Sequence, residues 1–266
     1  MKTFRPLPTL FLIGVLLPGA IAAQSPASRD SEALAVLGRM AAASGWTQLT
    51  VPVDVVATGV SVRHYGDNRS PMNVTLKAKG FRRYRTEVQD GISVSTTVVN
   101  GDRAAVLTSS GAQFFPPHAV LSMRPLTFPF LSELSTLADG DVTLRYVGTE
   151  TVWGELTHRI EIGRQPAADD PWGVSRALAS RITVWVSANT WLPVQIQHLR
   201  VPPGNPRLAK PFLRHLSDYR VVGGLLVPFR QEEFAKGTPI YTLQLNQVLV
   251  NVGLSDAEFA LPGGQQ

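Results

Sequence analysis

Apolar and polar residues alternate with a period of two along most of the chain from Leu49 onward. Successive side chains of a β-strand point to opposite faces, so this alternation predicts half-buried strands. Short breaks such as Asp90-Gly91 separate the runs and are typical of hairpin turns. The sequence therefore predicts a mainly β fold of about ten to twelve antiparallel strands joined as a meander, with one helix at the front and another in the middle.

One of the predicted hairpins carries two indoles. Residues 182–187 and 193–198 alternate around a short polar turn, with Trp185 before the turn and Trp191 inside it. On such a strand Ile182, Val184 and Val186 share one face, and Trp185 occupies the other face. We expect the aliphatic face to pack in the core, while the Trp185 indole lines a cavity or its rim.

The front helix is predicted for residues 31–44. Apolar residues recur at helical spacing in this segment, and Gly45 follows it as a C-terminal stop signal. After this helix the period changes to that of strands, so a single helix precedes the sheet.

A Pro-rich apolar segment interrupts the strands in the middle of the chain. Phe114 and Phe115 lie directly before Pro116-Pro117, a composition that predicts irregular backbone outside a regular sheet. Residues 124–140 then place Phe128, Leu131, Leu134 and Leu137 three positions apart, which predicts a short apolar helix. This helix either caps the hydrophobic core or gates a cavity.

The first residues have the composition of a secretory leader. Lys2 and Arg5 precede an apolar run from Leu10 to Leu17, and Ala20-Ile21-Ala22 offers the small residues that a signal peptidase accepts. The apolar run is too short to span a bilayer comfortably, so we expect a soluble mature chain. The expected organisation is a signal peptide (1–23), a linker (24–30), one domain (31–262) and a C-terminal tail (263–266).

Cysteine is absent from the sequence, which excludes a lipid-modified cysteine, a disulfide and a thiolate metal site. An exported chain without disulfides points to a bacterial envelope, so the expected location is the periplasm, without lipidation. The formal charge of +5 includes two leader cations and is too small to indicate nucleic acid binding.

The sequence contains no recognisable catalytic or metal-binding motif. Its histidines show no i, i+4 pairing, and its serines lie in no nucleophile elbow. Glu232 and Glu233 are neighbours on a predicted strand, so they should lie on opposite, solvated faces rather than converge on a substrate. We therefore expect a protein that is not an enzyme and has no cofactor or metal.

Six short motifs in a fixed order carry a family resemblance. They are Gly45-Trp46 after the front helix, Asn100-Gly101-Asp102, Gly148-Thr149-Glu150 with Gly154, Val184-Trp185 with Leu192-Pro193, Asp218-Tyr219 with Val227-Pro228, and Val250-Asn251-Val252 leading to Pro262. With these motifs the mature chain resembles the LolA/LolB-like outer-membrane lipoprotein carriers and their wider relatives, which include anti-sigma regulators with the same half-barrel.

The resemblance implies an antiparallel sheet curled into an incomplete β-barrel, with helices across its concave face. It also implies an apolar cavity that holds acyl chains or another hydrophobic ligand, for which burial alone supplies affinity. The residues expected to bind the ligand are Trp46, Phe128, Phe130, Leu134, Leu137, Trp153 and Trp185.

The function expected from the resemblance is that of a periplasmic, carrier-like protein that binds lipid or lipoprotein acyl chains. The chain lacks a lipobox cysteine, which excludes the membrane-anchored receptor form. Two alternatives remain open: an extracytoplasmic sensor or assembly module that binds a protein partner through the same half-barrel, and an envelope hydrolase.

The leader generates the first prediction. When the chain is expressed with its leader in a bacterial host, N-terminal sequencing of the periplasmic fraction should find a mature protein that begins near Ala23 or Gln24. A cytoplasmic pool that retains Met1 would contradict the secretory interpretation.

Overall fold

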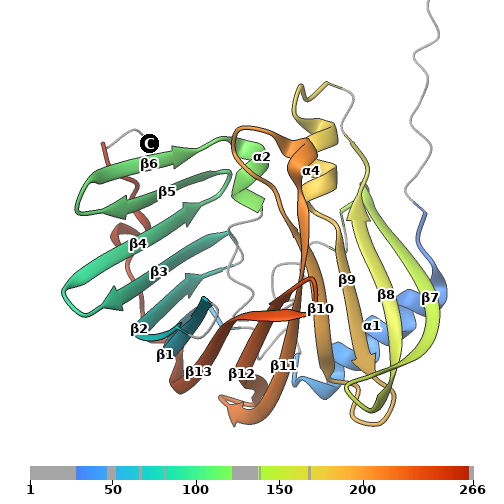
Figure 1. Ribbon diagram of the computed structural model, residues 1–266. Helices are drawn as coiled ribbons and strands as arrows, with labels where there is room; N and C mark the ends of the chain where they lie inside the picture. Colours follow the sequence, from blue (N-terminus) through green and yellow to red (C-terminus); the bar gives the residue numbers. More distant parts are fainter. Residues whose placement is uncertain are drawn as a thin grey trace, which may run out of the picture.

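Thirteen antiparallel strands form one open sheet in the computed structural model (Figure 1), which describes residues 28–46, 52–65, 68–80, 82–121, 137, 139–166 and 169–263. The strand order is β6-β5-β4-β3-β2-β1-β13-β12-β11-β10-β9-β8-β7. The mainly β meander predicted from the alternation is confirmed, and the sheet has one strand more than the upper end of the predicted number.

The chain enters the sheet in its middle and runs first to one edge. Helix α1 (Ser31–Ala43) precedes six strands that pair in sequence order. They are β1 (Asp54–Tyr65), β2 (Asn68–Lys79), β3 (Arg83–Asp90), β4 (Ser93–Asn100), β5 (Arg103–Thr108) and β6 (Gly111–Phe115).

The chain then crosses to the other edge and returns to the middle, where β13 pairs with β1. The elements of this second half are α2 (Pro117–Val120), β7 (Val142–Val152), β8 (Glu155–Arg164), α4 (Gly173–Ala179), β9 (Ile182–Ser187), β10 (Pro193–Arg200), η2 (Pro206–Leu208), β11 (Lys210–Val222), β12 (Leu225–Ala235), β13 (Thr238–Val250) and η3 (Asp256–Phe259).

The sheet is open because its two edge strands, β6 and β7, do not pair with each other. A pairing between these two strands is the one that a closed barrel would add. The N-terminal residues cover part of the β7 edge. The N–H of Asp30 donates to the carbonyl of Leu144 at 3.1 Å, and the N–H of Leu144 donates to the carbonyl of Ser28 at 3.0 Å. An uncovered strand edge offers unpaired N–H and C=O groups to other chains, and this bridge removes some of them.

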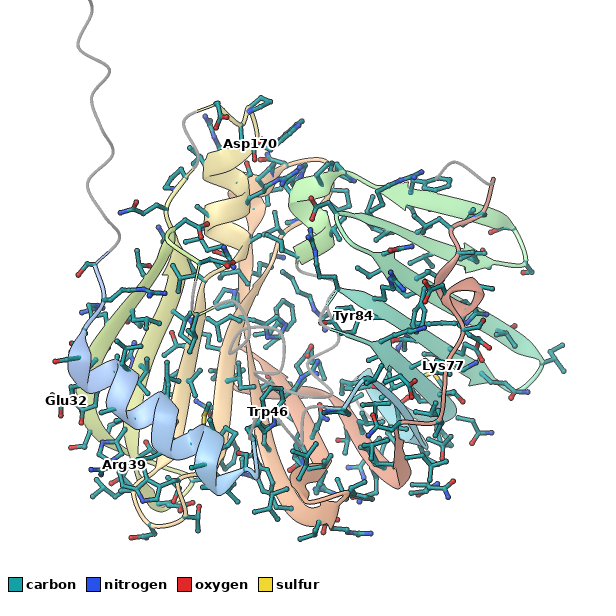
Figure 2. All side chains as sticks on the ribbon, turned by 180° about the vertical axis from the view of Figure 1, so that it is seen from behind. Glu32, Arg39, Trp46, Lys77, Tyr84 and Asp170 are labelled. Atoms are coloured by element: carbon teal, nitrogen blue, oxygen red, sulfur yellow. The ribbon has the colours of Figure 1, made fainter. Side chains whose placement is uncertain are left out.

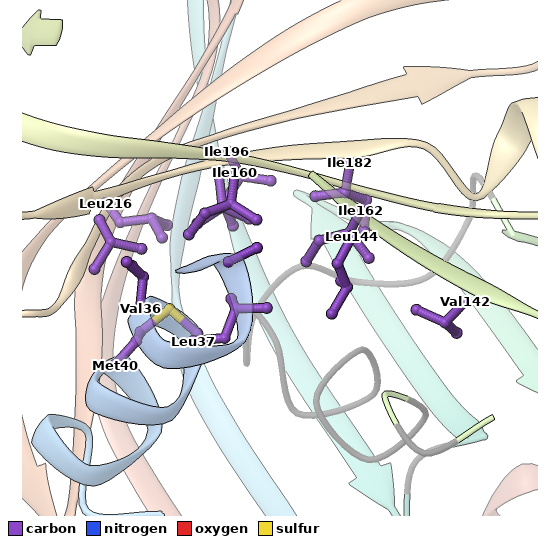
Figure 3. Packing of buried hydrophobic residues seen from close by; sticks show 13 residues of the cluster. Val36, Leu37, Met40, Val142, Leu144, Ile160, Ile162, Ile182, Ile196 and Leu216 are labelled. Carbon is purple, nitrogen blue, oxygen red and sulfur yellow. The ribbon is translucent and has the colours of Figure 1, made fainter. Parts of the chain in front are cut away.

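One face of the sheet, here named the α1 face, carries the main core. Val36, Leu37 and Met40 of α1 pack against the aliphatic side chains of β7 to β11, as Figure 3 shows. The face continues through the register of the sheet. One row of cross-strand partners on it consists of Ile160, Val184, Ile196, Arg214, Glu233, Tyr241 and Arg63.

A glycine fixes the end of α1 against β12. Gly45 has a φ of +79°, and a Cβ atom there would lie 2.1 Å from the carbonyl oxygen of Gly224. The N–H of Leu226 donates to the carbonyl of Ser44 at 3.0 Å, which ties the two segments together. Only glycine fits both the left-handed backbone and this close approach, so the predicted front helix and its stop signal are confirmed.

The C-terminal segment lies along the other face of the sheet, here named the opposite face. The Asp54 carboxylate accepts hydrogen bonds from the N–H groups of Val252, Gly253 and Leu254 at 2.7 to 3.0 Å. Phe259 is completely buried, and the neighbouring Glu258 pairs with Lys77 at 2.8 Å. Figure 2 shows Lys77 beside this segment.

Two features of the middle of the chain differ from the sequence predictions. Phe114 and Phe115 lie in β6 and pair with β5, because the turn at Thr108–Gly111 brings the two short strands together before the prolines begin. A further helix, α4, follows Trp172 between β8 and β9 and adds to the two helices predicted from the sequence; Ala177 and Ala179 are buried there. Most of the predicted helix at 124–140 lies outside the described residues.

The described helices are too short, or too polar, to cross a membrane.

The packing of α1 generates a prediction about stability. Leu37→Ala removes a buried side chain that is 1% exposed and should lower the free energy of unfolding by about 2–5 kcal/mol. Leu34→Ala is the matched control on the same helix, because Leu34 is 40% exposed and leaves no cavity. Urea unfolding measures both; equal losses would show that α1 is not packed as described.

Candidate functional site

The central part of the α1 face is a strip of apolar side chains, here named the central strip. It belongs to strands β1, β2, β12 and β13. Among the hydrophobic side chains described outside the strands, Trp46 packs against this strip. All residues of the central strip are buried, with exposed fractions of 0–7%: Val55, Ala57, Val74, Leu76, Leu225, Val227, Phe229, Leu243, Leu245 and Val248.

Trp46 marks one end of the central strip. It follows the C-terminal turn of α1, and Figure 2 shows it between the two halves of the sheet. Its backbone N–H donates to the carbonyl of Ala41 at 2.8 Å, so the helix end determines where the indole lies. The adjacent contact between Gly45 and Gly224 places it near Leu225, the first residue of β12.

The other end of the central strip is polar. Arg200, Arg214, Glu233 and His198 gather there and form what we call the polar cluster. Nη2 of Arg214 donates to Oε2 of Glu233 at 2.6 Å, and Nη2 of Arg200 donates to Oε1 of the same carboxylate. Nη1 of Arg214 also donates to Oε1 of Gln231 at 3.2 Å. Two guanidinium groups thus share one carboxylate.

Burial and charge act against each other on the groups of the polar cluster. Burial raises the pKa of Glu233, but Arg214 and Arg200 outweigh it, so that the pKa lies below its usual range. For His198, burial and then the charge of Arg214 lower the pKa to about 3, although Glu233 raises it. Glu233 is therefore ionised and His198 neutral near pH 7.

Two of the predicted ligand-binding tryptophans lie on the opposite face. Trp185 is buried, and its Nε1 donates to Oε1 of Glu150 at 2.6 Å. Trp153 is 55% exposed at the turn between β7 and β8, where its Nε1 donates to Oε1 of Gln195 at 3.0 Å. Its ring lies 4.5 Å from that of His215. These contacts attach both indoles to neighbouring strands.

A groove of about 580 Å³ lies on the outer strands β7 to β10, and Arg159 in its lining lies over the Trp185 ring. Side chains of the opposite face form much of its lining, among them Arg145, Arg159, Glu161 and Arg181. Arg145 pairs with Glu161 at 2.5 Å, and Arg159 lies 3.5 Å from the same residue. Ligand pockets for apolar molecules are lined mostly by hydrophobic side chains, so this groove is a poor site for an acyl chain.

The structure divides the predicted ligand-binding residues between the two faces. Trp46 and Leu137 are half-buried against the clusters of the α1 face, whereas Trp153 and Trp185 lie on the opposite face. Three further residues lie outside the described part of the chain: Phe128, Phe130 and Leu134.

Sequence reasoning missed the polar cluster. Glu232 and Glu233 do lie on opposite faces, as predicted, but Glu233 is completely buried rather than solvated. A signal was present in the sequence, because the alternation that buries Val227 and Phe229 also puts Glu233 on the buried face. Within the described residues, no three His, Asp or Glu side chains are grouped in a way that could hold a metal ion.

The architecture is that of the LolA-like fold. A domain provisionally called an outer membrane lipoprotein-sorting protein, from Vibrio parahaemolyticus, matches with a TM-score of 0.56 at 10% identity, covering 86% of this chain and 96% of that chain. A LolA superfamily protein from Nitrosomonas europaea matches with a TM-score of 0.54 at 13% identity, over 86% and 97% of the two chains.

A DUF1329 family protein from Desulfovibrio piger has the same fold, with a TM-score of 0.55 and 13% identity over 86% of this chain and 97% of that chain. No protein-family model and no curated protein matches the sequence. At these identities the comparisons establish the fold, and the resemblance seen in the sequence motifs is confirmed at that level.

The buried imidazole generates a prediction about pH. His198 is neutral in the folded protein and becomes protonated in the unfolded chain below about pH 6.5, so acid favours unfolding. This contribution to stability is present above pH 6.5 and is lost as the pH falls toward 3, by at most about 1.4 kcal/mol per pH unit. Wild type should therefore lose more stability than His198→Gln between pH 7 and pH 5.

Urea unfolding at the two pH values measures this difference. In NMR spectra, the imidazole signal that disappears in His198→Gln should not titrate between pH 5 and 8. Titration of that signal near pH 6.5 would contradict the burial of His198.

Proposed function

We propose that this protein binds the acyl chains of a lipid or lipoprotein on the central strip and carries them in the bacterial periplasm. The observation that supports the proposal is the strip itself, a set of apolar side chains across four central strands. These side chains are 0–7% exposed, and Trp46 is the described hydrophobic side chain from outside the strands that packs against them. A ligand on the strip therefore has to take the place of what covers it. The LolA-like fold is consistent with this use. The leader-like residues 1–23 support the location.

The dimensions of the central strip suit an acyl chain. The strip extends over four positions of β12 from Leu225 to Phe229, or about 13 Å, and over five positions of β13 from Leu243 to Val248, or about 17 Å, at roughly 3.3 Å per residue. The hydrocarbon core of a bilayer is about 30 Å thick, so the acyl chains of one leaflet extend over about 15 Å. The strip is therefore long enough for one extended chain.

Burial of apolar surface supplies the affinity without any bond chemistry. Each Å² of apolar surface removed from water contributes about 25 cal/mol, or about 0.8 kcal/mol for each buried CH₂ group. Part of this gain is offset by the loss of ligand freedom. A carrier also has to release its cargo. Affinity that arises from apolar burial is lost when the segment that covers the ligand moves away.

The ligand contacts in this proposal are Trp46 and Leu137 on the α1 face, together with Phe128, Phe130 and Leu134 in the segment outside the described residues. Trp153 and Trp185, which sequence reasoning grouped with them, lie on the other side of the sheet. They therefore distinguish the two faces in an experiment.

The first test is a titration with a fluorescent acyl probe. Trp46→Ala removes an indole from the central strip and should raise the Kd of the probe by about tenfold, which corresponds to about 1.4 kcal/mol. Trp153→Ala is the matched control, because it removes an indole from the opposite face and should change the Kd by less than about twofold. Thermal melts of both variants show the folded fraction.

The outcome that contradicts the site is a loss of affinity in Trp153→Ala with none in Trp46→Ala. Native mass spectrometry of purified protein tests the function directly and should show co-purified lipid. Protein without lipid and without probe binding, isolated with a stable protein partner, would favour the sensor or assembly module instead.

A further inference from the structure

We propose that the ligand of the central strip is an amphiphile with an anionic head group, a carboxylate or a phosphate, and that the polar cluster binds this head group. The inference rests on the proposed function and adds to it the chemical class of the ligand. The site for the head group is made by Arg200 and Arg214, which contact Glu233, and by Arg63, which lies two strands away in the same cross-strand row.

The central strip leads directly to these cations. Along β12 the side chains of Leu225, Val227 and Phe229 precede Gln231 and Glu233 on the same face. On the neighbouring strand β13, Tyr241 lies opposite Glu233, and on β1 Arg63 lies opposite Tyr241. A molecule that lies along the strip from Trp46 therefore ends against the polar cluster.

Among the residues that the structure describes, the charges of this end do not balance. Arg200 and Arg214 share the single carboxylate of Glu233, and Arg63 adds a third positive charge in the same cross-strand row, two strands away from Glu233. His198 is neutral and cannot change this sum. An apolar surface that ends in an excess of positive charge is complementary to a fatty tail with an anionic head group.

Two of the three cations, Arg200 and Arg63, are accessible to a head group, whereas the side chain of Arg214 is 13% exposed. Glu233 is completely buried, whereas the side chain of Arg200 is 49% exposed and Arg63 is exposed as well. A guanidinium group has five N–H donors, so Arg200 keeps donors beyond its bond to Glu233. Bidentate donation to a carboxylate or phosphate is the contact that arginine makes best.

Fold stability does not account for this arrangement. A buried carboxylate between two arginines is often no more stabilising than apolar side chains of the same volume, because its desolvation is costly. Nδ1 of His198, which is 9% exposed, has no hydrogen-bond partner among the described residues. A buried polar group without a hydrogen-bond partner requires an explanation. A ligand head group that supplies the missing hydrogen bonds is one.

The groove on the opposite face is a weaker candidate for an anion. Of its arginines, Arg145 and Arg159 already pair with Glu161, and Arg159 also lies 3.5 Å from Glu150. Its charges are therefore close to balanced. Arg181 lines the same groove and is exposed, which makes it a matched control for removing a surface arginine.

The test compares probes that share one fluorescent tail and differ in the head group: a free carboxylate, its methyl ester and a monoester of phosphate. At pH 7.5 and low salt, the wild-type protein should bind the anionic probes at least about tenfold more tightly than the ester, and added salt should reduce this ratio. The stronger of the two anionic probes identifies the head group.

Arg63→Gln and Arg200→Gln should each reduce the ratio of anion to ester affinity several-fold while the Kd of the ester stays unchanged. Arg181→Gln should leave the ratio as it is. Arg63 is exposed, so its variant tests the inference even if Arg200→Gln unfolds. Equal binding of ester and anion by wild type overturns the inference but leaves the acyl site in place. Failure of every probe to bind overturns both.

Discussion

The whole structure depends on the burial of one apolar face of an unclosed sheet. All thirteen strands contribute to the α1 face, and the two edge strands β6 and β7 do not pair, so the sheet cannot bury this face by closing on itself. Other segments of the chain have to exclude water from it. Helix α1 does so over β7 to β11, where it produces the largest continuous core.

The same face serves as core at one end and as candidate ligand surface in the middle. Under α1 the side chains interlock, and Leu37 and Met40 are almost completely buried. Over the central strip, Trp46 is the described contact from outside the strands. The side chains of the strip are 0–7% exposed, so a ligand there has to replace what covers them, and the proposed function assigns an acyl chain to this position.

The polar cluster limits the apolar surface and gives it a direction. Without it, an acyl chain could lie on the strip in either orientation, because hydrophobic burial is non-directional. With Trp46 at one end and Arg200, Arg214 and Glu233 at the other, the two ends differ in charge. Direction and head-group choice then arise from electrostatics, while most of the affinity arises from burial.

Alternation along single strands was sufficient to predict most of the sheet and the two faces of β9. It failed where the sequence signal was short or mixed: β5 and β6 are brief, and Phe115 is followed directly by prolines. The sequence did not show which face of the sheet α1 covers, because the helix could lie on either side of β9. It was therefore not possible to derive which tryptophans lie on the same face as α1.

The polar cluster could not be predicted either. Glu233 meets Arg214 and Arg200 across 19 and 33 residues of sequence, and only the register of β10, β11 and β12 brings these charges together. Period-two alternation identified the face of Glu233 but not its partners. A carboxylate on a strand is ordinarily solvated, so the sequence alone favoured the wrong environment.

The central claim is that the ligand lies along the central strip of the α1 face. Photo-cross-linking with an acyl chain that carries a diazirine near its end, followed by peptide mapping of the labelled protein, tests this most directly. The account predicts labels on peptides of β1, β12 and β13, with the head group near Arg200 and Arg63. Labels confined to β8 and β9 beside the groove of the opposite face would contradict it.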